Sequence, residues 1–375
     1  MAIEKRLVLR MEISNTTKNA ITAGLSRRIS VFGFFCALLI VLLHSTPRPT
    51  YGTWEWWVAS FLGRDGLCRI AVPFFFLASG FLLAGHVCDQ GWWWRELNKR
   101  VKTLIVPYFV WIVIGFLFNS ILWYAIGLYG HKCDFQSPFY RPVSLWLTNI
   151  VGANPFSNSV GILWYVRSLF LLVIASKILV LALRCMGWVF VIVLFAAYGI
   201  FAVSFTGGAT DIVTCFEYFL TLRGLCYFTI GIALRYCRFG FMLECSRTVS
   251  FVLLIVGVGL LFLKVIFLRE VALKAAAVTD IIMVPMLCAG FFITARNICL
   301  PRWLVDNAFA IYLIHMKVLL LTMPVIVIAG IKEKLGVSVA LWIARFAVAA
   351  SISLFTAVLL KKYVPRCSSV LFGGR

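Results

Sequence analysis

The stretch RISVFGFFCALLIVLLHS (Arg28–Ser45) sets the interpretation of the whole chain. After its leading arginine it is almost wholly apolar for about four helical turns, and it then ends on His44. Ionisable side chains inside membrane segments are rare and usually functional. We therefore treat His44 as a candidate functional residue. An imidazole bonded to water or phosphate in the headgroup region is the alternative, and this helix alone does not separate the two.

The composition indicates a polytopic membrane protein. Of the 375 residues, 62% are hydrophobic and only 13% are charged, and the mean hydropathy is +0.99. The net charge of +21 could suggest a nucleic-acid partner, but the basic residues stand between apolar runs, as topology signals do, so we expect none. The twelve cysteines show no CxxC pair and no Cys/His ligand spacing. We therefore expect neither a disulfide framework nor a metal site.

Ten apolar runs predict the fold. A spanning helix needs roughly 20 mainly apolar residues, and lipid forces the backbone to bond within its own segment. We therefore predict an all-α membrane protein of about ten transmembrane helices. The runs are 30–45, 68–86, 104–128, 162–183, 188–205, 217–235, 249–268, 276–294, 307–329 and 338–360.

The basic residues predict the orientation. In a ten-helix arrangement 21 of the 35 lysines and arginines fall on one side, and nine fall on the other. The positive-inside rule then places both termini in the cytoplasm and His44 at the outer end of the first helix. We predict a cytoplasmic basic segment at 1–28, a transmembrane domain at 29–361 and a cytoplasmic tail at 362–375.

Two longer segments are expected outside the membrane, at about 46–67 and 129–161. The first holds Trp54, Trp56 and Trp57, which suit an interfacial aromatic belt. The second contains prolines, asparagines and serines and reads as an irregular loop, either functional or a simple connector.

Several charged side chains lie where lipid is expected. Each would cost several kcal/mol if it faced lipid, so we expect these groups to face one another or a wet cavity. They are Arg167, Glu217, Arg223, Asp280, His315, Lys317 and Arg345. Arg167, Glu217 and Asp280 fall on the same side as His44, so a shared outward-facing polar cavity is possible. The alternative is a set of structural ion pairs, such as Glu217 with Arg167, and snorkelling at helix ends.

Five stretches, taken in order, resemble the membrane-bound acyltransferase family 3, the multi-spanning O-acyltransferases of bacterial polysaccharides. Each is weak alone, but together they cover nearly the whole chain in the family's order. They are ALLIVLLHS at the end of the first helix, RIAVPFFFLASGFLL (Arg69–Leu83), LNKRVKTLIVPYFVW (Leu97–Trp111), LWYVRSLFLL (Leu163–Leu172) and NAFAIYLIHMKVL (Asn307–Leu319).

One position departs from the family pattern. The family usually carries an arginine eleven residues before the first-helix histidine, where this chain has Gly33. Arg28 lies sixteen residues before His44, about 24 Å along a helix, so it does not replace that arginine. The departure bears on how the acyl donor is held and on whether the chain is active.

The resemblance implies a multi-pass enzyme of the bacterial inner membrane. It would move an acyl group, expected to be acetyl, from acyl-CoA to a hydroxyl of a cell-envelope sugar or polysaccharide. Its partners would be membrane lipid, the carbohydrate acceptor and acyl-CoA, with no permanently bound cofactor. Two alternatives remain open: a transporter or flippase of a lipid-linked sugar, and a catalytically altered homologue.

The same resemblance suggests roles for individual residues. His44 would be the base, since a neutral imidazole has a suitable pKa, or would carry the acyl group itself. Arg69 and Arg167 would hold anions or stabilise developing charge, and Glu217 and His315 would bind substrate or stabilise charge. For His315 the alternatives are that it orients the acceptor or that it simply bonds within the bundle. Three basic residues lie in the segment around the start of the third apolar run: Lys99, Arg100 and Lys102. They would either bind a polyanionic donor or anchor the topology. Ser79 and Gly80 would allow close helix packing.

Overall fold

The computed structural model describes the chain in nine stretches: 23–46, 49–63, 65–87, 89–128, 162–205, 222–236, 246–268, 273–328 and 338–374. Every regular element within these stretches is a helix, which confirms the all-α prediction. Glu217 and the predicted loop 129–161 lie outside the described residues.

Each of the ten apolar runs contains a helix. These elements are α2 (Ala23–Ser45), η1–α4 (Leu67–Ala84), η2–α6 (Val101–Leu128), α8 (Trp164–Met186), α9 (Trp188–Phe205), α11 (Leu222–Tyr236), α12–η5 (Arg247–Leu268), α14 (Leu273–Thr294), α16 (Ala308–Ile328) and α18 (Val339–Tyr363). The remaining elements are α3 (Trp54–Leu62), α5 (Trp92–Arg100), η6 (Ala295–Asn297), α15 (Arg302–Val305) and α19 (Pro365–Phe372).

Seven helices in the described residues are long and apolar enough to cross a membrane. Two shorter apolar helices, Trp188–Ser204 and Ala308–Thr322, accompany them. The chain is thus a multi-pass membrane protein, while ten spans and cytoplasmic termini stay predictions.

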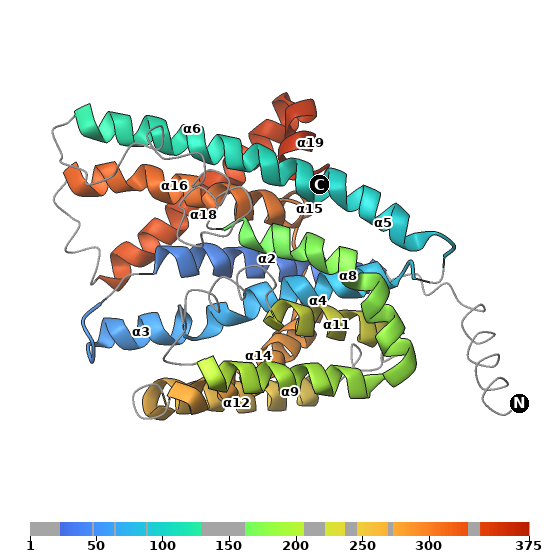
Figure 1. The fold of residues 1–375 in the computed structure, drawn as a ribbon. Coiled ribbons are helices and arrows are strands. Elements are labelled where there is room, and N and C mark those ends of the chain that lie inside the picture. Colours follow the sequence, from blue (N-terminus) through green and yellow to red (C-terminus); the bar gives the residue numbers. More distant parts are fainter. Residues whose placement is uncertain are drawn as a thin grey trace, which may run out of the picture.

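The helices form one bundle with α2 near its middle (Figure 1). Helix α6 runs along one edge of the picture, and α12 and α9 run along the other. Around α2 pack α4, α16 and α18, and α11 packs against α4. The histidine-bearing first helix is therefore surrounded by protein rather than placed at the rim.

Helices α4 and α11 meet backbone to backbone. A Cβ atom added at Gly80 would overlap the main chain of Phe228, and one at Gly231 would overlap the carbonyl of Leu77. Small residues let transmembrane helices approach this closely, so the prediction for Gly80 is confirmed.

Two segments expected between or beyond the spans are helical. Trp54–Leu62 forms α3, which Thr53 caps by accepting a hydrogen bond from the Trp56 amide, and Trp56 is buried against its aromatic neighbours. The predicted tail from residue 362 includes the end of α18 and all of α19. Helix α19 packs on α6, where the Trp111 indole donates to the Leu371 carbonyl at 2.9 Å.

The bundle has two ends that can be told apart by their contacts. The Trp342 indole donates to the Leu42 carbonyl at 3.1 Å, which brings the start of α18 to the end of α2. Helix α18 therefore runs antiparallel to α2. We call the end of the bundle that carries Lys361 and Lys362 the basic end, and the opposite end the His44 end.

Candidate functional site

The structure brings together two of the predicted site residues, His44 and His315. Their ring centroids lie 5.3 Å apart, with the planes inclined by 38°. His44 is exposed at the end of α2, whereas His315 is fully buried in α16. The sequence named both residues as candidates, and the packing of α16 on α2 makes them neighbours.

The His315 ring has a defined orientation. Its Nδ1 atom lies 2.7 Å from the Tyr312 carbonyl and 3.2 Å from the Ile311 carbonyl. Since a carbonyl oxygen only accepts, Nδ1 carries the proton and donates it. Nε2 then holds the lone pair, and within the described residues this buried atom has no hydrogen-bond partner. An unsatisfied buried acceptor is costly, and a water molecule or a substrate group from outside the chain would satisfy it.

Aromatic rings continue from this pair into the bundle. The Tyr312 ring lies 6.2 Å from that of His315, and the Tyr165 ring lies 5.8 Å from that of Tyr312. The Tyr312 hydroxyl donates to the Ile162 carbonyl. These two tyrosines, from α16 and α8, separate the histidine pair from the basic half of the bundle.

A cavity of about 770 Å³ opens on the other side of the two tyrosines, at the basic end. Its wall is formed by the start of α2, most of α4, the start of α8, α15, the start of α16 and the end of α18. Gly33 is part of this wall and precedes His44 by eleven residues, about 16 Å along α2. The polar groups in the lining include Ser30, Ser79, Asp306, Asn307, Lys361 and Lys362.

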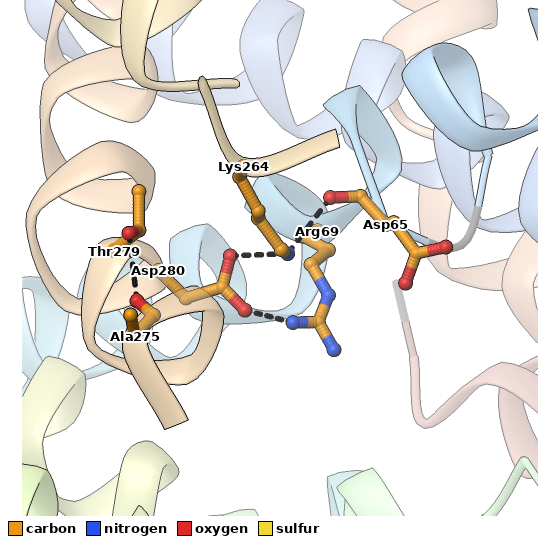
Figure 2. Close-up of polar contacts among 6 residues, drawn as sticks. All are labelled: Asp65, Arg69, Lys264, Ala275, Thr279 and Asp280. Carbon is orange, nitrogen blue, oxygen red and sulfur yellow. Dashed lines mark hydrogen bonds and ion pairs between the residues drawn. The ribbon is translucent and has the colours of Figure 1, made fainter. Parts of the chain in front are cut away.

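A separate ion cluster involves Arg69 (Figure 2). The Asp280 carboxylate accepts from the Arg69 guanidinium through one oxygen and from Lys264 Nζ at 2.6 Å through the other. Lys264 also donates to the Asp65 carbonyl at 3.0 Å. The cluster joins η1, η5 and α14, and the Lys264 and Asp280 side chains are only 6% and 11% exposed.

This cluster changes the interpretation of Arg69. Sequence reasoning proposed it as an anion holder, but here its charge is met by a carboxylate of the chain itself. Lys264 was missed, although a single lysine inside the apolar run 249–268 was the available signal. Asp280 pairs with these two cations.

Arg167 and the basic residues of α5 have polar partners other than the two histidines. Arg167, buried in α8, forms a side-chain hydrogen bond with Tyr108 of α6. Lys99 and Arg100 lie 3.6 Å and 3.4 Å from the buried Glu96 carboxylate, an arrangement that fixes α5. A single cavity shared by His44, Arg167, Glu217 and Asp280 therefore stays a prediction.

Comparison with known proteins identifies the family of this chain. A family profile described as an acyltransferase domain matches residues 30–362. The succinoglycan biosynthesis protein ExoH of Rhizobium meliloti (strain 1021) is 29% identical over 172 residues, which are 42% of this chain and 43% of that protein. An amino-acid racemase of Enterococcus faecalis is 28% identical over 150 residues, which are 40% of this chain and 17% of that protein.

The chain thus spans less than half the length of these two curated relatives. No solved structure matches it. The family match covers most of the sequence, from the start of the histidine-bearing helix to the lysines at the end of α18. The chain therefore belongs to the acyltransferase 3 family.

Proposed function

We propose that this protein is an integral-membrane O-acyltransferase that moves an acyl group, acetyl in the simplest case, from acyl-CoA to a hydroxyl of a cell-envelope sugar. The family supports acyl transfer, and the name of the Rhizobium relative, a succinoglycan biosynthesis protein, supports a polysaccharide as the acceptor class. The basic end would face the cytoplasm, where acyl-CoA is made, and the His44 end would face the acceptor.

The observation that carries the proposal is the His44–His315 pair. One ring is exposed at the end of a buried helix, and the other lies 5.3 Å behind it with a lone pair that no group of the described chain uses. An imidazole base needs a lone pair within reach of the proton it removes. The pair offers such a base where an acceptor sugar has access.

The reaction follows from these positions. A neutral His44 imidazole takes the proton of the sugar hydroxyl while the oxygen attacks the thioester carbonyl carbon. The tetrahedral intermediate then collapses as the carbon–sulfur bond breaks. The CoA sulfur leaves with the electron pair and receives the proton from the His44 imidazolium. His315 is held by its Nδ1–H bond to the Tyr312 carbonyl, and its Nε2 lone pair would accept a hydrogen bond from His44 only once His44 has become the charged imidazolium.

A transfer assay with matched histidine variants tests the proposal. The purified protein is given labelled acetyl-CoA and an oligosaccharide acceptor. We expect His44→Ala to lower the transfer rate by about 10²- to 10⁴-fold, the usual contribution of general acid–base catalysis. His86→Ala is the control, because His86 is an exposed histidine beside Asp89 and Glu96.

Three outcomes would contradict the proposal. Unchanged transfer in His44→Ala would remove the proposed base. Movement of a lipid-linked sugar across vesicles without label transfer would favour a transporter. Absence of transfer by the unmodified chain with every short acyl-CoA would favour a catalytically altered homologue. That alternative is raised by Gly33, which stands where the family usually has an arginine.

A further inference from the structure

The geometry points to the cavity at the basic end as the binding site for the phosphate-bearing, amide-containing arm of the donor, an inference that rests on the proposed function. We propose that Lys361, Lys362 and the N-terminus of α16 bind the phosphates, and that Asn307 accepts a hydrogen bond from an amide of the arm. The thioester would then point past Tyr312 towards the histidine pair.

Asn307 supplies an acceptor that the described chain does not use. The residue lines the cavity and is only 4% exposed. Its Nδ2 donates to the Trp303 carbonyl at 2.6 Å, which fixes the orientation of the amide. Its Oδ1 is buried and has no partner within the described residues. A ligand amide N–H would satisfy this oxygen, as an amide-rich arm such as pantetheine can.

Helix α16 directs its positive end into the same cavity. Asn307 stands directly before the helix, and Ala308 and Phe309 of its first turn line the wall. The N-terminus of a helix favours anions, because its first N–H groups have no intrahelical acceptor and the helix dipole is positive there. This is the chemistry that a phosphate requires.

Two lysines complete the anion site. Lys361 donates to the Asp306 carbonyl at 2.9 Å, and Lys362 lies 5.2 Å from the centre of the Tyr363 ring. Both line the cavity, and Asp306 lines it as well. By contrast, Lys99 and Arg100 already face the Glu96 carboxylate. The lysines of α18 are thus better placed for an incoming anion than the basic residues of α5.

The cavity also lies at a workable distance from the histidine pair. Ala308 lines its wall, and His315 follows seven residues later in α16, about 10 Å along the helix axis. Tyr312 belongs to the cavity wall and its ring lies beside that of His315. A flexible arm held at Asn307 would therefore have to extend past the Tyr312 ring before its thioester reached the proposed base, His44.

Binding of two ligands distinguishes the phosphate contacts of this site from its amide contact. The purified full-length chain in detergent is titrated with CoA and with pantetheine, which has the amide arm but no phosphates. For the double variant Lys361→Gln/Lys362→Gln we expect the Kd for CoA to rise by about tenfold or more, as for lost charge-assisted bonds, while the Kd for pantetheine stays within about twofold. For Asn307→Leu we expect both Kd values to rise about three- to tenfold.

Arg366→Gln is the matched control. It removes a positive charge from exposed α19, a few residues beyond the two lysines and outside the cavity lining, and should leave both Kd values unchanged. Thermal unfolding and gel filtration show that each variant is folded, and the lysine and asparagine variants test the site independently.

The failures are distinguishable. If the unmodified chain does not bind CoA, the donor in the proposed function is wrong and the inference falls with it. If it binds CoA and the lysine variant binds it equally well, the inference is overturned while the proposed function stands. If the lysine variant differs only in vesicles of anionic phospholipid, these lysines hold a lipid headgroup, which also overturns the inference.

Discussion

Two polar groups inside this apolar bundle differ in how completely the chain satisfies them. Around Asp280 both carboxylate oxygens accept from a cation, and Lys264 also reaches a backbone carbonyl. At His315 one ring nitrogen is bonded to the helix, and the other is buried without a partner in the described chain. A cluster in which every polar atom has a partner holds helices together, whereas a polar atom without a partner is available to a substrate.

The largest effect on stability should come from breaking the ion cluster of Arg69, Lys264 and Asp280. Asp280→Asn leaves two cations facing one another with no carboxylate between them. Removing one partner of a buried ion pair typically costs about 3–5 kcal/mol, so we expect a strongly lowered thermal unfolding midpoint. The exposed Asp89→Asn is the control, since its carboxylate pairs with the exposed Arg95. A stable but inactive Asp280→Asn protein would assign this cluster to the site instead.

A change at His315 should lower the rate rather than the stability. His315→Phe keeps the buried ring but removes Nε2, so we expect kcat to fall about 10- to 100-fold with little change in KM for the donor. His315→Gln, which keeps a polar group near the Nε2 position, should retain more activity. If the variants fail to fold and show no selective fall in kcat, His315 has a structural role rather than a role in the reaction.

The smallest expected effect is a difference in stability between two glycine variants, one at the tight α4–α11 contact and one on the cavity wall. Gly80→Ala places a methyl group against the Phe228 backbone, and overpacking of this kind costs about 1–3 kcal/mol. Gly33→Ala on the cavity wall meets only ring carbons of Phe74 and Phe75 at 3.7–3.8 Å and should be tolerated. Equal unfolding midpoints for the two variants would contradict the difference drawn between the α4–α11 contact and the cavity.

Much of the helical architecture followed from the sequence, because lipid leaves the backbone few choices. All ten apolar runs contain helices, and Gly80 lies at a close helix contact. The hydrophobicity of 46–67 did not reveal α3, since tryptophans suit both an interfacial loop and a short buried helix. The helix α19 was missed because it has only eight residues, which are too few for a sequence pattern to indicate a helix clearly.

The site was only partly predictable. His44 and His315 stood out as histidines in apolar runs, but their proximity depends on how α16 packs on α2. Arg69 was given an anion-binding role because its counter-charges, on α14 and η5, are distant in sequence. The cavity draws its wall from six helices, so no single stretch of sequence shows that Asn307 and Lys361 face a common space.

The most direct test of the central claim is the acylation of surface glycans in cells that carry His44→Ala in place of the unmodified gene. Mass spectrometry of those glycans should show loss of the acyl mass, while His86→Ala cells keep it and both proteins reach the membrane in equal amounts. Intact acylation in the His44→Ala cells would contradict the account, because the proposed base would then be dispensable.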